Sequence, residues 1–75
     1  MIKILSLLII KIDKTEEVIE KLKRIQQVKE LFFITGKYDI ALIIRGASSG
    51  EIYSVFTNDI DVIDGIISSE SHLIM

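Results

Sequence analysis

The sequence contains no cysteine and only one histidine, and both scarcities limit what the chain can be. Without cysteine no disulfide can stabilise the fold, and a metal site of the Cys or Cys/His kind is excluded. A chain of 75 residues must then gain its stability from dense packing or from oligomerisation. Hydrophobic residues make up 49% of the chain, more than a domain this small readily buries, so the composition favours oligomerisation.

The chain also lacks a concentration of positive charge. Its formal net charge is −2, and the lysines between positions 11 and 29 are interleaved with glutamates. A protein that binds DNA or RNA directly needs a basic face to neutralise phosphates. We therefore expect no direct contact with nucleic acid.

No hydrophobic run is long enough to cross a membrane. The apolar stretch at residues 1–10 ends at Lys11 and Asp13. A helix that spans a membrane needs about 20 apolar residues. The stretch also lacks the small-residue cleavage site of a signal peptide. We expect one domain over residues 1–75, located in the cytoplasm and without a membrane partner.

The hydrophobic pattern predicts six elements, four strands and two helices. They are a strand at 2–12, a helix at 13–27, strands at 28–34 and 39–45, a helix at about 49–58 and a strand at 66–75. Residues 60–64 fit either a longer second helix or a connecting turn. This order predicts the α+β, ferredoxin-like βαββαβ fold, in which two helices cover one face of an antiparallel four-stranded sheet.

Two short polar patterns predict where the helices begin. Asp13 and Glu16 have the spacing of a capping box, and Thr15 is a competing cap. Ser48 and Glu51 repeat the spacing before the second helix. In each case the first side chain is expected to accept a backbone N–H of the helix.

The first three predicted strands are apolar on both faces. Side chains alternate between the faces of a strand, and in all three strands both sets are rich in Ile, Leu or Phe. Helices on one face leave the other bare, and burying apolar surface contributes roughly 25 cal/mol per Å². We therefore predict a dimer that pairs its two sheets face to face.

Residue types that could support catalysis or metal binding are sparse. His72 has no cysteine or second histidine to work with, and a strand residue is its simplest interpretation. Asp59, Asp61 and Asp64 lie near the end of a predicted helix without the spacing of a calcium loop. We predict no catalytic residue, no metal site and no cofactor.

The turn at residues 35–39 is the best place to look for a ligand. Thr35, Gly36, Tyr38 and Asp39 gather there between two apolar strands. A hairpin turn alone explains a glycine and an aspartate, and residue types alone favour that interpretation. The alternative is a site in which backbone N–H groups bind a carboxylate and Asp39 pairs with an ammonium, the two charged ends of an amino acid.

The stretch Val28–Leu42 carries a family resemblance. It is similar to the pattern V-x-x-x-x-x-V-T-G-x-Y-D, followed by an apolar strand, of the effector-binding (RAM) domain of Lrp/AsnC transcription regulators. Ser48, Gly65, Ile66 and Ser71 continue the resemblance at matching distances, and residues 2–24 fit it more loosely. Gln26 stands where the family has a proline, and Ser71 stands where a threonine is common.

The resemblance implies a stand-alone RAM domain, because the family's regulators carry an N-terminal helix-turn-helix that this sequence does not show. It implies dimers that pair through their sheets and assemble into octamers or decamers. It also implies a small effector, often an amino acid, bound where dimers meet. Gly36, Tyr38 and Asp39 carry over as ligand-binding residues, and Thr35, Ser69 and Ser71 are further candidates by position.

The sequence therefore predicts an amino-acid-sensing domain that is not an enzyme. It would shift between assembly states when a free amino acid binds, and it would modulate full-length Lrp/AsnC regulators by mixed assembly without binding DNA itself. Two alternatives remain. One is a small dimeric α/β-barrel enzyme, which would need a pocket containing His72, and the other is a purely structural oligomerisation module.

Overall fold

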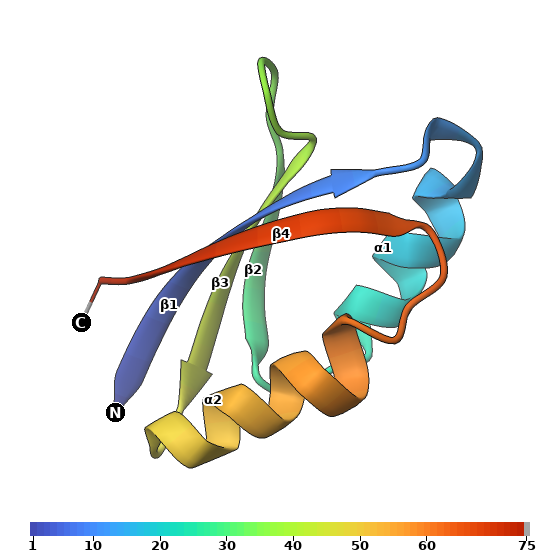
Figure 1. Ribbon diagram of the computed structural model, residues 1–75. Helices are drawn as coiled ribbons and strands as arrows, with labels where there is room; N and C mark the ends of the chain where they lie inside the picture. The colour runs from blue at the N-terminus through green and yellow to red at the C-terminus, as the bar shows by residue number, and fades with distance from the viewer. Residues whose placement is uncertain (75) are drawn as a thin grey trace.

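Residues 1–74, which are the part of the chain that the computed structural model describes, form an antiparallel four-stranded sheet with two α-helices (Figure 1). In chain order the elements are β1 (Ile2–Ile10), the 3₁₀ turn η1 (Ile12–Lys14), α1 (Thr15–Lys23), β2 (Val28–Phe33), β3 (Ile40–Gly46), α2 (Ser49–Val55), the π-helical turn η2 (Phe56–Ile60) and β4 (Ile66–Leu73). This is the predicted ferredoxin-like fold.

The sheet has the strand order β2-β3-β1-β4, so β1 and β3 are central and β2 and β4 are the edges. β1 pairs with β3 on one side and with β4 on the other, as the blue and red ribbons show in Figure 1. Leu7, for example, lies opposite Ala41 and Glu70, so these three side chains share one face. β4 was predicted to reach Met75, which lies outside the described residues.

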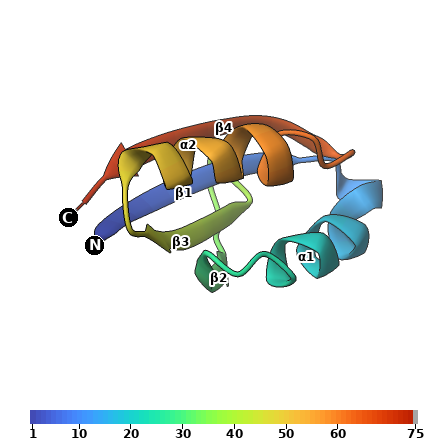
Figure 2. The ribbon, with the colours of Figure 1, turned by 90° about the horizontal axis from the view of Figure 1, so that it is seen from below.

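The core lies between the helices and one face of the sheet. Even-numbered residues of β1 and β3 point to this face, and Figure 2 shows the two helices against the strands from below. The buried members from the helical layer are Val18, Leu22, Ile52, Val55, Ile60 and Ile63, and those from the sheet are Leu8, Ile10, Ile40, Leu42 and Ile44. Each such side chain contributes about 1.5–3 kcal/mol relative to exposure.

The first helix is shorter than predicted, and its predicted cap is wrong. The N-terminal turn tightens into η1, in which Lys14 N donates to Lys11 O at 3.0 Å and the backbone N–H of Thr15 donates to Ile12 O. This i→i+3 bonding satisfies a backbone N–H that a capping side chain would otherwise accept. Asp13 therefore caps nothing, and the Thr15 hydroxyl donates to Ile12 O at 2.8 Å instead of accepting a helix N–H.

The second helix begins as predicted and continues further. Ser48 Oγ accepts the N–H of Glu51 at 3.2 Å, and the Glu51 carboxylate reaches back to Ala47 N at 3.3 Å. This reciprocal pair resembles a capping box in which the acid bonds one residue earlier than usual. Beyond Val55 the chain continues through η2 to Ile60, and a turn that ends at Gly65, with φ +108°, leads into β4.

The second face of the sheet is covered by no helix among residues 1–74, and we call it the open face. Its apolar centre consists of Leu5, Leu7, Ile9, Phe32, Ala41 and Ile43. Phe32 is 49% exposed there.

Within the described residues, no helix is both long and apolar enough to span a bilayer.

Candidate ligand-binding site

Residues 34–39 connect β2 to β3 and project beyond the end of the sheet (Figure 1). Ile34 N donates to Asp39 O at 3.0 Å and closes the turn. Gly36 has φ +104°, a conformation that side chains rarely adopt, although a Cβ there would meet no atom within 4 Å. The glycine therefore serves the backbone of the turn, and the space around it is open.

Asp39 fastens the turn to the central strand. Its backbone N–H donates to Leu8 O at 2.9 Å, and its carboxylate Oδ2 accepts the N–H of Ile10 at 3.0 Å. The carboxylate thus bonds a backbone N–H of β1 just beyond the point where the pairing with β3 stops, at Leu8 and Ile40. Within residues 1–74, the second carboxylate oxygen of Asp39 has no hydrogen-bond partner.

A cavity of about 220 Å³ opens beside this carboxylate, between the turn and the start of the first helix. It is lined by Ile10, Ile12, Thr15, Phe33, Ile34, Asp39 and Ile40. Five of these seven side chains are apolar, and Ile12 and Phe33 are largely exposed at its rim. We call it the turn cavity, and it offers one carboxylate and one hydroxyl in an otherwise apolar wall.

Tyr38 reaches away from the turn to the far edge of the sheet. Its hydroxyl donates to Glu70 Oε1 on β4 at 2.8 Å, and Glu70 Oε2 lies 2.7 Å from His72 Nε2. Lys37 sits 5.6 Å from the centre of the Tyr38 ring. The hydrogen bonds from Tyr38 and from His72 lower the pKa of the Glu70 carboxyl, and the bond to Glu70 raises the pKa of Tyr38.

Ser69 and Ser71 lie on the side of β4 that faces the helices, opposite to the side of Glu70. Ser71 is opposite Ser6, and their Oγ atoms are 3.2 Å apart. Ser6 is completely buried, so the pair satisfies a polar group under the helical layer. Glu70, between the two serines, points to the open face, where Tyr38 meets it.

The structure therefore divides the predicted ligand-binding residues into three groups. Asp39 borders the turn cavity, and Thr35 and Gly36 belong to the turn beside it. Tyr38 joins Glu70 on the open face, and the two predicted serines on β4 face the opposite way.

Sequence reasoning missed Glu70 and the apolar wall of the turn cavity. The alternation along β4 already placed Glu70 and His72 on one face. Nothing in the spacing, however, indicated that Tyr38 would cross β1 to reach them.

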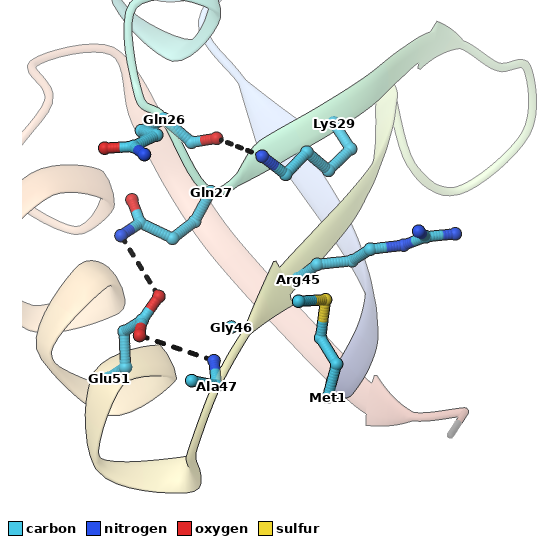
Figure 3. A pocket seen from close by; sticks show the side chains of 8 residues that line it. All are labelled: Met1, Gln26, Gln27, Lys29, Arg45, Gly46, Ala47 and Glu51. Atoms are coloured by element: carbon cyan, nitrogen blue, oxygen red, sulfur yellow. Dashed lines mark hydrogen bonds between the residues drawn. The ribbon is translucent and has the colours of Figure 1, made fainter.

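Another cavity, of about 190 Å³, lies at the opposite end of the sheet (Figure 3). It is lined by Met1, Gln26, Gln27, Lys29, Arg45, Gly46, Ala47 and Glu51. Its polar groups largely bind one another: Gln27 Nε2 donates to Glu51 at 3.3 Å, and Lys29 Nζ donates to Gln26 O at 2.9 Å. Figure 3 shows Arg45 pointing away from Glu51, so no pair of opposite charges converges on this cavity.

Comparison with known proteins gives a family match over most of the chain. The model of the Lrp/AsnC ligand binding domain matches residues 7–75. The regulatory protein AsnC of Haemophilus influenzae is 37% identical over 60 residues, which cover 80% of this chain and 40% of that protein. The chain spans less than half the length of the curated relatives it matches.

Solved structures agree with this match. Escherichia coli AsnC superposes with a TM-score of 0.92 at 25% identity, over 99% of this chain and 50% of that one. A transcriptional regulator from Neisseria meningitidis, solved as a complex with L-Met, has the same TM-score at 14% identity, over 99% of this chain and 49% of that one. At 14% identity, the similarity to the Neisseria meningitidis regulator shows a shared fold only.

Proposed function

Because the chain belongs to the Lrp/AsnC family of ligand-binding domains, we propose that it binds a free amino acid at the turn of residues 35–39. The family is one of transcription regulators and not of enzymes, which rules out the barrel-enzyme alternative. The observation that carries the proposal is the Asp39 carboxylate. One of its oxygens is held by Ile10 N–H, and the other is available beside the turn cavity.

The chemistry of the turn fits the charged ends of an amino acid. A carboxylate held in place by a backbone bond can pair with an α-ammonium without first being ordered, which favours binding. Gly36 is exposed and a Cβ there would meet no atom within 4 Å, which supports the turn's backbone N–H groups as the partners of the ligand's carboxylate. Thr35 and Tyr38 lie on either side of this segment in the sequence.

The wall of the turn cavity favours an apolar amino acid. Ile10, Ile12, Phe33, Ile34 and Ile40 surround the space next to Asp39. A polar side chain placed there would lose water without gaining partners, whereas an aliphatic side chain gains about 0.8 kcal/mol per buried CH₂. That a regulator of the same fold was solved with L-Met supports this class of ligand.

Regulation would act through assembly. We propose that two copies pair through their open faces and that such dimers build octamers or decamers in which the turns meet their neighbours. An apolar patch at the centre of a sheet face that no helix covers is unusual for a monomer, which supports the pairing. An amino acid bound at the turn would shift the balance between assembly states by binding one of them more tightly.

The domain would act in the cytoplasm on full-length regulators of the same family rather than on DNA. The net charge of −2 provides no basic surface for phosphates. Mixed assembly through the open face would let this chain replace one subunit of a DNA-binding oligomer. Co-purification of this chain with a full-length family member, and its loss in a variant with a charged open face, tests that step.

Isothermal titration with each of the twenty amino acids tests ligand binding directly. Asp39→Asn is the informative variant, because its amide oxygen can still accept Ile10 N–H while the negative charge is lost. We expect an apolar amino acid to bind the wild type and to bind Asp39→Asn at least about tenfold more weakly. Asp59→Asn is the control, since Asp59 is exposed and outside the turn cavity.

Absence of binding by every amino acid, with assembly intact, would refute the sensing role. That result would favour the alternative in which the chain is only an oligomerisation module.

A further inference from the structure

Three side chains connect the turn to the open face. Tyr38 belongs to the turn, whereas Glu70 and His72 project from β4 beside Leu7 and Leu5 on the open face. Because β1 lies between β3 and β4, the Tyr38 side chain must cross the central strand to reach Glu70. The two regions that the proposed function invokes are therefore in contact within one chain.

The geometry of this connection is specific. The Tyr38 hydroxyl donates to one carboxylate oxygen of Glu70 at 2.8 Å, and His72 Nε2 lies 2.7 Å from the other. Glu70 is thus held from both sides, and a charged acceptor makes each bond stronger than a neutral one. Lys37 adds a favourable positive charge near Glu70. The β1 residues that face the two β4 side chains, Leu7 and Leu5, carry no charge.

We propose that Tyr38, Glu70 and His72 form a link through which effector binding at the turn and pairing of the open faces influence each other. The inference rests on the proposed function, since it assumes that both events occur. Glu70 acts as a positioning residue, because it touches neither the ligand nor the turn cavity but fixes the side chain of Tyr38.

The link has consequences in both directions. A second sheet packed on the open face would restrict Glu70 and His72, and through the hydroxyl bond it would restrict Tyr38 and the turn. A ligand that ordered the turn would likewise fix Glu70 in the position that the partner sheet meets. Such coupling is reciprocal by thermodynamic necessity, and values of 5- to 150-fold are typical.

Hydrogen exchange of the amides of residues 35–38 tests the link without any effector. Exchange is measured below and above the concentration at which the chain self-associates, and variants are compared at equal fractions associated. In the wild type we expect association to slow exchange of these amides roughly fivefold or more. In Tyr38→Phe and Glu70→Ala we expect association to leave their exchange unchanged.

Two matched controls separate the link from general perturbation. Tyr53→Phe removes a hydroxyl from an exposed tyrosine on α2, and Glu30→Ala removes a carboxylate from the open face at β2. Both controls should behave as the wild type. Wild-type exchange that is indifferent to association, or a Tyr38→Phe variant that keeps the full response, would overturn the link.

A second arm uses the effector. The self-association constant is measured with and without the amino acid that titration identifies, and the ratio should fall towards one in Tyr38→Phe and Glu70→Ala. A ratio that stays at the wild-type value in both variants would overturn the link. If no amino acid binds the wild type, the proposed function fails while the exchange experiment still decides the link.

Discussion

The Asp39 carboxylate has a structural role and a proposed ligand-binding role, and each uses a different oxygen. One carboxylate oxygen accepts the N–H of Ile10, the other has no hydrogen-bond partner within residues 1–74, and the residue lines the turn cavity. A substitution can therefore weaken the fold, the ligand site or both, depending on which oxygen is lost. Binding data on an Asp39 variant are informative only beside a measurement of stability.

We expect Asp39→Ala to destabilise the chain by about 1–2 kcal/mol, because it leaves the N–H of a buried strand residue without its partner. Asp39→Asn should cost less, since the amide oxygen can replace Oδ2. Urea denaturation followed by circular dichroism measures both changes. Equal stability of the wild type and Asp39→Ala would show that the Ile10 bond contributes nothing.

Glu70 should make stability depend on pH in the acidic range. Its hydrogen bonds to Tyr38 and His72 lower its pKa in the folded state below the ordinary value of 4.5. A depressed pKa adds stability above the ordinary value, and that contribution is lost as the pH falls through the folded value. We expect the urea midpoint to drop less between about pH 6 and about pH 3 in Glu70→Gln than in the wild type.

Glu30→Gln is the control for this comparison, since Glu30 shares the open face but has no such bonds. A Glu70→Gln variant with the full wild-type pH dependence would contradict the assignment.

At the scale of the elements, the sequence predicted the order and class of every helix and strand. It succeeded because the helices carry apolar residues at helical spacing, and the strands are short runs of Ile, Leu and Phe separated by polar turns. It erred at the start of the first helix, where a capping pattern at Asp13 gave way to a 3₁₀ turn. Backbone bonds and side-chain caps compete for the same N–H groups, and spacing alone cannot decide between them.

The candidate site was harder to predict than the elements. The turn itself follows from local residue types such as Gly36 and Asp39. The turn cavity instead combines residues from β1, β2, the turn and the first helix, and the Tyr38–Glu70 bond joins residues 32 positions apart. Such contacts depend on how the elements pack, which periodicity does not report.

The two glycines with positive φ lie in different connections and should respond differently to alanine. At Gly65 a Cβ would lie 2.7 Å from Lys14 Cβ and 2.8 Å from Val18 Cγ2, whereas at Gly36 it would meet nothing within 4 Å. Gly36→Ala should cost about 1–2 kcal/mol for the backbone alone. Gly65→Ala should cost clearly more, about 2–4 kcal/mol, since the first helix must also move. Thermal denaturation of the two variants side by side tests the order.

For the whole molecule, the open face is the feature that a single chain leaves unexplained. Leu7 lies in its apolar centre, between Ala41 and Glu70. We expect Leu7→Lys to weaken self-association at least about 100-fold, because a charge would be buried without a partner. Sedimentation equilibrium measures the effect, and Val62→Lys, on an exposed residue outside the sheet, is the control.

If Leu7→Lys associates as strongly as the wild type, the copies do not pair through this face. Near-ultraviolet circular dichroism of the variant should stay native-like in either case, since Leu7 points away from the helical core.

The buried Ser6–Ser71 pair has a consequence for the accuracy of folding. In a strand with one polar face, a shift of one residue exposes apolar side chains and is rejected on that ground. β1 is apolar on both faces over its centre, so there such a shift would exchange one set of Ile and Leu side chains for another. Ser6 breaks this near-symmetry, because a shifted strand would separate its hydroxyl from Ser71 and put an apolar side chain in its buried position. Together with Lys3 near the start of the strand, this hydroxyl pair thus distinguishes the correct alignment of the central strand from its nearest competitor.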